Sequence, residues 1–310
     1  MALAGDFSGL SCPAIVGPTA SGKTSLVTAL ATQLPIEVIS LDSRQIYRGL
    51  RIGTAQPTAE EQAICRHHLI DFVSPDEKYD AVRFRNDFQE AFVAIKERGG
   101  IPILAGGAGM YLKALREGFM EIPGHSPERL AEVRQEVAAW DETTLRLKLQ
   151  QNDPDSFSRI HPNDTYRSQR AMEIFLISGR TMTDLMKAQK PDPCLGLNFP
   201  AFVLQRKVDK LDERIAQRTA LMLKQGWIEE TEAALKKHDP MGPGLQSIGY
   251  REIVSFLNDG FPRAELEAAI ILVTRQYAKR QRTMFRNLEN ATEGHPESDD
   301  LLVGLLECLG

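Results

Sequence analysis

An eight-residue loop near the N-terminus constrains the fold of this chain more than any other part of the sequence. The apolar run Ala14–Val16 precedes the loop and predicts a strand, whereas residues 25–33 follow it and predict a helix. This order of elements directs backbone N–H groups into one hollow, where the helix N-terminus adds partial positive charge. The chain is therefore predicted to bind a diphosphate or polyphosphate. The loop residues are Gly17, Pro18, Thr19, Ala20, Ser21, Gly22, Lys23 and Thr24.

Polar side chains of the loop and of the next strand suggest chemistry beyond binding. Lys23 supplies a full positive charge, and the Thr24 hydroxyl is of the kind that holds Mg²⁺ in such loops. Asp42 directly follows the predicted strand at residues 36–40, which places it at the carboxyl edge of a sheet near the loop. A carboxylate there can bind Mg²⁺, act as a general base, or cap the following helix. The residue pattern leaves these three roles open.

Strands and helices alternate over the first 120 residues. Further strands are predicted at residues 68–72 and 101–105, with a helix at residues 81–98 between them. Alternation of this kind predicts an α/β fold with a parallel sheet flanked by helices and ligands at the carboxyl ends of the strands. Glycines at 106, 107 and 109 follow the last of these strands and permit close backbone approach to a ligand or a neighbouring strand.

The pattern becomes helical after Pro123. Asp141, Asp153 and the run Pro162–Asp164 resemble helix caps between consecutive helices, and no strand pattern appears there. We therefore expect an all-helical insertion at 123–198 and a phosphate-loop core at 1–122 and 199–310. The tail from Glu289 is expected to be less ordered. Within the second part of the core, a strand is predicted at 199–204 and helices at 210–225, 228–237, 250–258 and 263–287.

Charge and cysteine content limit the classes of protein to which this chain can belong. The net charge is −5, so any attraction to nucleic acid must be local. The four cysteines are far apart and predict neither a metal site nor a disulfide framework, which fits a reduced cytoplasmic setting. No apolar run reaches the roughly 18 residues of a membrane span. Two basic clusters suit an RNA backbone or a solvated helix face: Arg159, Arg167 and Arg170 beside Tyr166, and Arg275, Lys279, Arg280, Arg282 and Arg286.

Taken together, these motifs resemble the bacterial tRNA dimethylallyltransferases, also called tRNA isopentenyltransferases, over nearly the whole chain. Each motif is short, but their order and spacing are specific to that family. They are the phosphate loop, Asp42–Tyr47, Ile52–Ala55, His67–Asp71, Gly106-Gly107, Tyr111–Leu115, His161–Asp164, Ser178–Thr181, Ile248–Glu252 and Thr274–Gln281.

The resemblance implies an activity and a set of site residues. The family transfers a dimethylallyl group from its diphosphate to the exocyclic amine of the adenosine 3′ of a tRNA anticodon, after that base leaves its stack. Asp42 would then be the general base, Lys23, the loop and Mg²⁺ would hold the leaving diphosphate, and Arg218 would contact it. The implied tRNA contacts are Asp42, Ser43, Arg44, Gln45, Ala108, Tyr166, Arg167, Ser168, Gln169, Arg170, Gly249, Tyr250, Arg251, Lys279, Arg280, Gln281 and Arg282.

Some positions depart from the family, and two other functions explain part of the pattern. Ala108 stands where the family usually has Thr, and Met284 where it usually has Trp. A small-molecule or nucleotide kinase explains the loop and the sheet, but gives the helical insertion no role. A non-catalytic RNA-binding protein explains the basic clusters, but not an acid beside a phosphate site. We expect an active, monomeric transferase.

Overall fold

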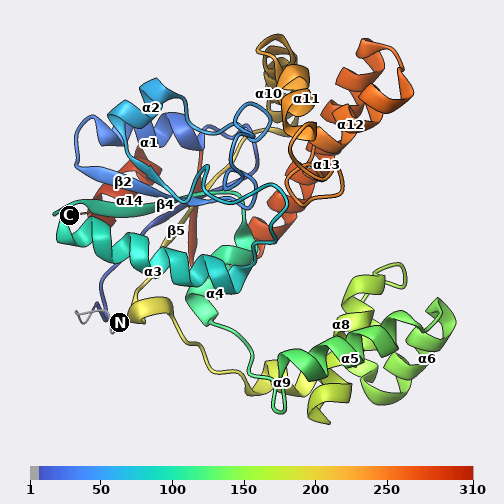
Figure 1. Cartoon of the computed structure of the whole chain (residues 1–310). Coiled ribbons are helices and arrows are strands. Elements are labelled where there is room, and N and C mark those ends of the chain that lie inside the picture. The colour runs from blue at the N-terminus through green and yellow to red at the C-terminus, as the bar shows by residue number, and fades with distance from the viewer. Residues whose placement is uncertain (1–6, 310) are drawn as a thin grey trace. The chain divides into compact units, whose positions relative to one another are not determined.

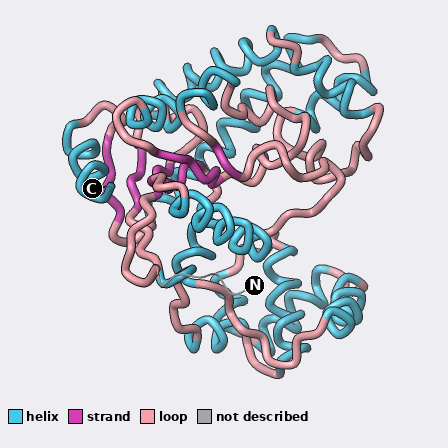
Figure 2. Tube along the Cα trace, turned by 60° about the vertical axis from the view of Figure 1, so that its left-hand side comes forward, coloured by secondary structure: helices cyan, strands magenta, loops and turns pink. Residues whose placement is uncertain are grey.

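The computed structural model describes residues 7–309, and a parallel sheet lies at the centre of its first unit (Figures 1 and 2). This unit comprises the chain up to Arg116 and from Pro193 onward. The six strands of the sheet are ordered β3-β2-β4-β1-β5-β6, and every paired neighbour is parallel. They are β1 (Ala14–Val16), β2 (Ile36–Leu41), β3 (His67–His68), β4 (Ile101–Gly106), β5 (Ala201–Leu204) and β6 (Ala291–Gly294).

Helices cover both faces of this sheet because successive strand residues point to opposite sides. Val16 on one face packs in a cluster with Phe88 of α3 and Phe285 of α13. Ile15 on the other face packs in a cluster with Val27 of α1 and Leu305 of α14. The helices of this unit are α1 (Lys23–Ala31), α2 (Ala59–Ile64), α3 (Ala81–Glu97), α4 (Gly109–Glu117), the 3₁₀ helix η1 (Cys194–Gly196), α10 (Val208–Lys224), α11 (Trp227–Leu235), α12 (Tyr250–Asp259), α13 (Arg263–Arg286) and α14 (Asp299–Leu309).

The second unit, Glu117–Asp192, is built of helices, and it begins and ends six residues before the insertion predicted at 123–198. Side-chain oxygens of Asp141, Asp153 and Asp164 accept hydrogen bonds from backbone N–H groups three residues on, which confirms them as helix caps. Val133, Leu145 and Met172 belong to its own small core. Its helices are α5 (Pro127–Ala138), α6 (Glu142–Asn152), α7 (Pro154–Arg159), α8 (Thr165–Ser178) and α9 (Met182–Ala188). No helix in the described part of the chain is long and apolar enough to cross a membrane.

Two sequence predictions about local structure are wrong. The strand predicted at residues 68–72 ends at His68, because Leu69 (φ 60°) and Asp71 (φ 56°) adopt left-handed conformations that interrupt an extended chain. The tail from Glu289 is not irregular: Ala291 pairs with Ala201 to add β6 to the sheet, and α14 buries Leu305. The tail is structured through tertiary contacts, which cannot be predicted from the sequence of its short, polar strand.

Candidate functional site

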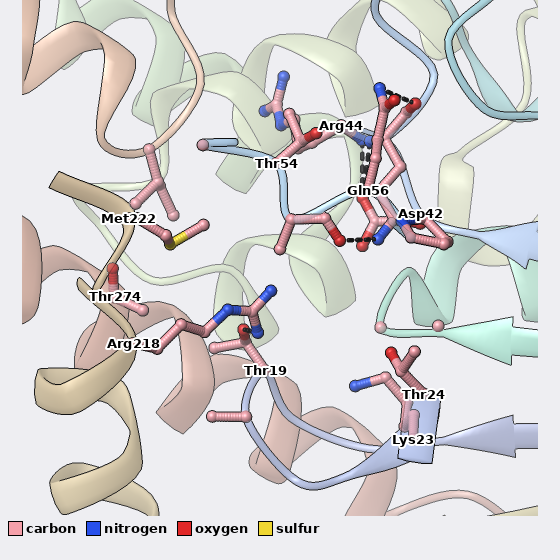
Figure 3. Close-up of a pocket in the computed structure, with 18 of the residues that line it drawn as sticks. Thr19, Lys23, Thr24, Asp42, Arg44, Thr54, Gln56, Arg218, Met222 and Thr274 are labelled. Carbon is pink, nitrogen blue, oxygen red and sulfur yellow. Dashed lines mark hydrogen bonds between the residues drawn. The ribbon is translucent and has the colours of Figure 1, made fainter. Parts of the chain in front are cut away.

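A cavity of about 1290 Å³ opens at the carboxyl ends of the strands in the first unit. Ligands bind at this edge in open parallel sheets because loops diverge there. The phosphate loop, the turn after β2, the segment 51–59 and the helices α10 and α13 line the cavity. Figure 3 shows Lys23 and Thr24 at the start of α1, Asp42 across from them at the end of β2, and Arg218 beside Thr19.

The phosphate loop adopts the curled backbone that its glycines permit. Ala20 (φ 63°) and Gly22 (φ 107°) are left-handed, and Lys23 opens α1. The Lys23 ammonium donates hydrogen bonds to the carbonyl oxygens of Gly17 at 3.0 Å and Pro18 at 2.8 Å. Burial lowers the pKa of Lys23 to about 8, against the opposing effect of nearby Asp42. The ammonium is therefore largely charged at neutral pH and has partners that an anion can replace.

Asp42 is partly buried at the end of β2. Its Oδ1 accepts hydrogen bonds from the backbone N–H groups of Arg44 at 2.8 Å and Gln45 at 3.3 Å, which form an Asx turn. Within residues 7–309 no hydrogen bond to Oδ2 is present, so this oxygen is available to a ligand. The negative charge of Asp42 acts on both Lys23 and Arg218. The turn thus fixes one carboxyl oxygen and leaves the other to accept a proton or a hydrogen bond.

Three arginines, one just after β5 and two on α10, surround the same loop. Arg218 Nη1 donates to Thr19 Oγ1 at 3.4 Å, and Arg214 Nε donates to the carbonyl oxygen of Ala20 at 2.8 Å. Arg206, just after β5, donates from Nε to the carbonyl oxygen of Ser21 at 2.7 Å. Burial lowers the pKa of Arg218, although its high ordinary value keeps the guanidinium charged. Concentrated positive charge of this kind favours binding of a phosphate-bearing anion.

Glu230 of α11 holds one wall of the cavity. Its carboxylate accepts hydrogen bonds from the backbone N–H groups of Arg51, Ile52 and Gly53 at 2.8, 2.9 and 3.2 Å. The Tyr250 hydroxyl donates to Glu230 at 2.6 Å, and this contact helps raise the pKa of Tyr250 well above its usual value, after burial as the main cause. Sequence reasoning missed Glu230, because nothing in a surface-helix pattern connects it to a segment almost 180 positions away.

We predict that Glu230→Gln destabilises the fold by about 1–3 kcal/mol, the usual cost of leaving partly buried donors without an acceptor. The amide presents only one oxygen, and its NH₂ group faces donors that need an acceptor. Urea unfolding of the variant measures this change. The matched control is exposed Glu229→Gln, which should unfold like the wild type. Equal stability of the two variants would contradict the prediction.

The residues implied as RNA contacts divide into exposed and buried groups. Tyr166 is 77% exposed, and the Arg167 side chain is 71% exposed in the second unit; Lys279 and Arg280 are exposed on α13. By contrast, Ser168, Tyr250 and Gln281 are buried, and their polar atoms are engaged inside the protein. Gly249 is also buried, whereas Ser43, Gln45, Gln169, Arg170 and Arg282 are half-buried, and Arg44 and Arg251 are exposed.

Ala108 occupies the N-cap of α4. Its carbonyl oxygen accepts hydrogen bonds from the backbone N–H groups of Tyr111 at 2.9 Å and Leu112 at 3.3 Å, and its methyl group offers no acceptor for the orphan donors of the first turn. Position 108 is absent from the cavity-lining residues of the described chain, whereas Gly106 and Gly107 are among them. A side-chain hydroxyl at this position would stand beside the first turn of α4, where a helix cap is needed.

We predict that Ala108→Thr stabilises the protein by about 1 kcal/mol, the usual value of a side-chain N-cap. The threonine hydroxyl would accept a hydrogen bond from the first turn of α4. Thermal unfolding measures the gain, and Ala108→Val is the control because it adds the same bulk without the acceptor. A valine variant as stable as the threonine variant would show that capping is not the cause.

Comparisons with known proteins agree on one family. A family model described as IPP transferase matches residues 45–288. The tRNA dimethylallyltransferase of Azoarcus sp. is 41% identical over 282 residues, covering 89% of this chain and 87% of its own length. That of Chromobacterium violaceum is 38% identical over 279 residues, covering 89% and 86% respectively.

Solved structures support the same conclusion. A tRNA isopentenylpyrophosphate transferase from Bacillus halodurans has a TM-score of 0.67 and 33% identity over 96% of this chain and 94% of its own. A eukaryotic dimethylallyltransferase acting on tRNA has a TM-score of 0.75 and 28% identity over 89% and 69%. The six-stranded parallel sheet with flanking helices accordingly confirms the predicted α/β class. With a family model matching most of its length and relatives near 40% identity over more than four fifths of both chains, this chain belongs to the IPP transferase family.

Proposed function

We propose that this protein transfers a dimethylallyl group from dimethylallyl diphosphate to the exocyclic amine of the adenosine 3′ of a tRNA anticodon. The observation that carries the proposal is the shared cavity of Asp42 and the phosphate loop. A carboxylate beside a phosphate cradle supports a reaction in which a nucleophile loses a proton while a phosphate-bearing group is held, a requirement that a kinase shares. The family of the chain supports the same substrates.

In the proposed reaction, one bond breaks at carbon and one forms there. The bond between the allylic carbon and the diphosphate oxygen breaks with its electron pair, and diphosphate departs toward Lys23, Arg218 and the loop N–H groups. The adenine amine bonds to the same carbon and gives one proton to Asp42 Oδ2. Developing negative charge on the leaving group is thus met by fixed cations and dipoles, which is the larger catalytic contribution. Proton acceptance by Asp42 adds general-base catalysis.

The residues of the loop also fit a bound Mg²⁺. Thr24, the second residue of α1, is exposed at the mouth of the loop, and Mg²⁺ is usually held by few protein oxygens together with substrate phosphates. The described residues contain no group of three His, Cys, Asp or Glu side chains suited to a metal. We therefore assign Mg²⁺ to the Thr24 hydroxyl and the diphosphate oxygens. When bound, the ion would neutralise charge on the diphosphate.

RNA contact is assigned to the exposed members of the two basic clusters. In the second unit these include Tyr166 and Arg167, with half-buried Arg170 beside them, where an aromatic ring and guanidinium groups suit unstacked bases and phosphates. On α13 they include Lys279 and Arg280, and Arg280 also lines the cavity. We propose that the anticodon stem-loop is the part of the tRNA that these residues bind.

The proposal is tested by adding Mg²⁺, dimethylallyl diphosphate and an anticodon stem-loop with adenosine 3′ of the anticodon. Mass spectrometry of the RNA should show one added dimethylallyl group, and a stem-loop with guanosine at that position should remain unmodified. ATP turnover with no prenylated RNA would favour the kinase alternative. RNA binding without either reaction would favour a non-catalytic RNA-binding protein.

A further inference from the structure

One buried carboxamide joins three parts of the cavity wall. Gln281 of α13 is 5% exposed. Its Oε1 accepts a hydrogen bond from the backbone N–H of Thr19 at 2.9 Å, and its Nε2 donates to the carbonyl oxygen of Gly107 at 3.1 Å. A single side chain therefore connects the helix, the phosphate loop and the turn after β4, although neighbouring Arg280 is exposed to solvent.

Two glycines leave the space in which this carboxamide and a neighbouring methionine of α13 pack. A Cβ atom on Gly107 would lie 2.0 Å from Gln281 Nε2, and one on Gly109 would lie 2.5 Å from Met284 Sδ. Contacts this short are far inside van der Waals distance, so the two glycines leave the space that the Gln281 and Met284 side chains of α13 occupy. The glycines after β4, predicted to permit close approach of a ligand or a neighbouring strand, contact helix side chains of the same chain instead.

Gln281 and Lys23 hold opposite sides of one peptide group. The peptide between Pro18 and Thr19 donates its N–H to Gln281, while its carbonyl oxygen accepts from the Lys23 ammonium at 2.8 Å. An arriving diphosphate competes for Lys23 and removes that second restraint. The hydrogen bond to Gln281 does not involve the cation, so it persists through the exchange and keeps the loop N–H groups aimed at the ligand.

We propose that Gln281 is a positioning residue of the phosphate loop. It acts through the Pro18–Thr19 peptide and keeps the loop in its binding shape when Lys23 transfers its hydrogen bonds to the diphosphate. The inference rests on the proposed function, in which this loop holds the leaving group. In this proposal Gln281 acts on the phosphate loop inside the protein, and not as the RNA contact that the family resemblance implies.

Binding of inorganic diphosphate with Mg²⁺, measured by calorimetry, tests this role without requiring transfer. Gln281→Met keeps the side-chain length but removes both hydrogen bonds, so diphosphate should bind about tenfold more weakly. Affinity for the anticodon stem-loop should stay within about twofold of the wild type. The matched control is Gln33→Met on the exposed residue after α1, which should change neither affinity. Weaker RNA binding with unchanged diphosphate binding would overturn the proposal, as would no change in either.

A second variant keeps the test valid if Gln281→Met does not fold, which thermal unfolding reveals. In Gly107→Ala the new methyl group would displace the Gln281 carboxamide, so this variant should weaken diphosphate binding by a similar factor. Gln281→Ala makes room for the new methyl group. The loss of diphosphate affinity in the double variant should therefore be clearly smaller than the sum of the losses in the two single variants. Additive losses would mean that the residues do not act through one contact. A wild-type protein that binds diphosphate but transfers no prenyl group would refute the proposed function and leave this inference intact.

Discussion

The Asp42→Asn variant is expected to transfer the dimethylallyl group about 10²- to 10⁴-fold more slowly than the wild type, the usual contribution of a general base. Asparagine has nearly the same shape, and its Oδ1 can still accept the hydrogen bonds from Arg44 and Gln45 that form the turn. Only the ability of the second oxygen to take a proton is lost. Single-turnover kinetics with saturating RNA and donor measure this chemical step apart from product release.

The effect of Asp42→Asn should be confined to chemistry. Affinity for the anticodon stem-loop and the unfolding midpoint should remain close to those of the wild type. A suitable control is Asp80→Asn, because Asp80 also accepts two backbone hydrogen bonds, at the start of α3. That variant should transfer the prenyl group normally. Unchanged transfer by Asp42→Asn would remove Asp42 as the base and leave it only the structural role in its turn.

The Lys23→Met variant is expected to lose about 10²- to 10³-fold in kcat, the typical loss when one donor to a developing anion is removed. Lys23 belongs to the phosphate loop, and its ammonium donates hydrogen bonds to two carbonyl oxygens of that loop. Methionine keeps most of the length of the side chain but offers no charge to the departing diphosphate. Rapid-quench measurement of prenylated RNA checks the result. Exposed Lys237→Met should retain wild-type kcat, and an equal loss there would point to a non-specific effect of charge.

Diphosphate affinity should also depend on pH through Lys23. Because burial lowers its pKa to about 8, the ammonium is charged below that pH and neutral above it in the free protein. The affinity for Mg²⁺-diphosphate should therefore fall as the pH rises through 8. The same titration of Lys23→Met isolates this contribution, since protonation of the ligand itself affects both proteins equally. Parallel curves for the two proteins would show that Lys23 does not cause the change.

Sequence pattern predicts much of the fold because local rules and tertiary packing agree there. The strands β1, β2 and β4 and the helix α3 begin and end within one residue of the predicted positions. For α3, the Asp80 cap and the glycines that follow the helix are local sequence signals. The tail is the opposite case. Strand β6 has no apolar alternation and exists because β5 offers it an open edge. Helix α14 is stabilised when Leu301 and Leu305 cover the sheet.

By itself, the sequence determined the phosphate loop, the placement of Asp42 at a strand end, the α/β class and the helical insertion, because each depends on neighbouring residues. Tertiary structure alone decided how the loop is held. Gln281 reaches Thr19 across 262 positions, and Glu230 reaches Ile52 across 178. Both look like ordinary polar helix residues in the sequence. Their roles arise because a buried backbone N–H needs an acceptor, and only the folded chain determines which side chain provides it.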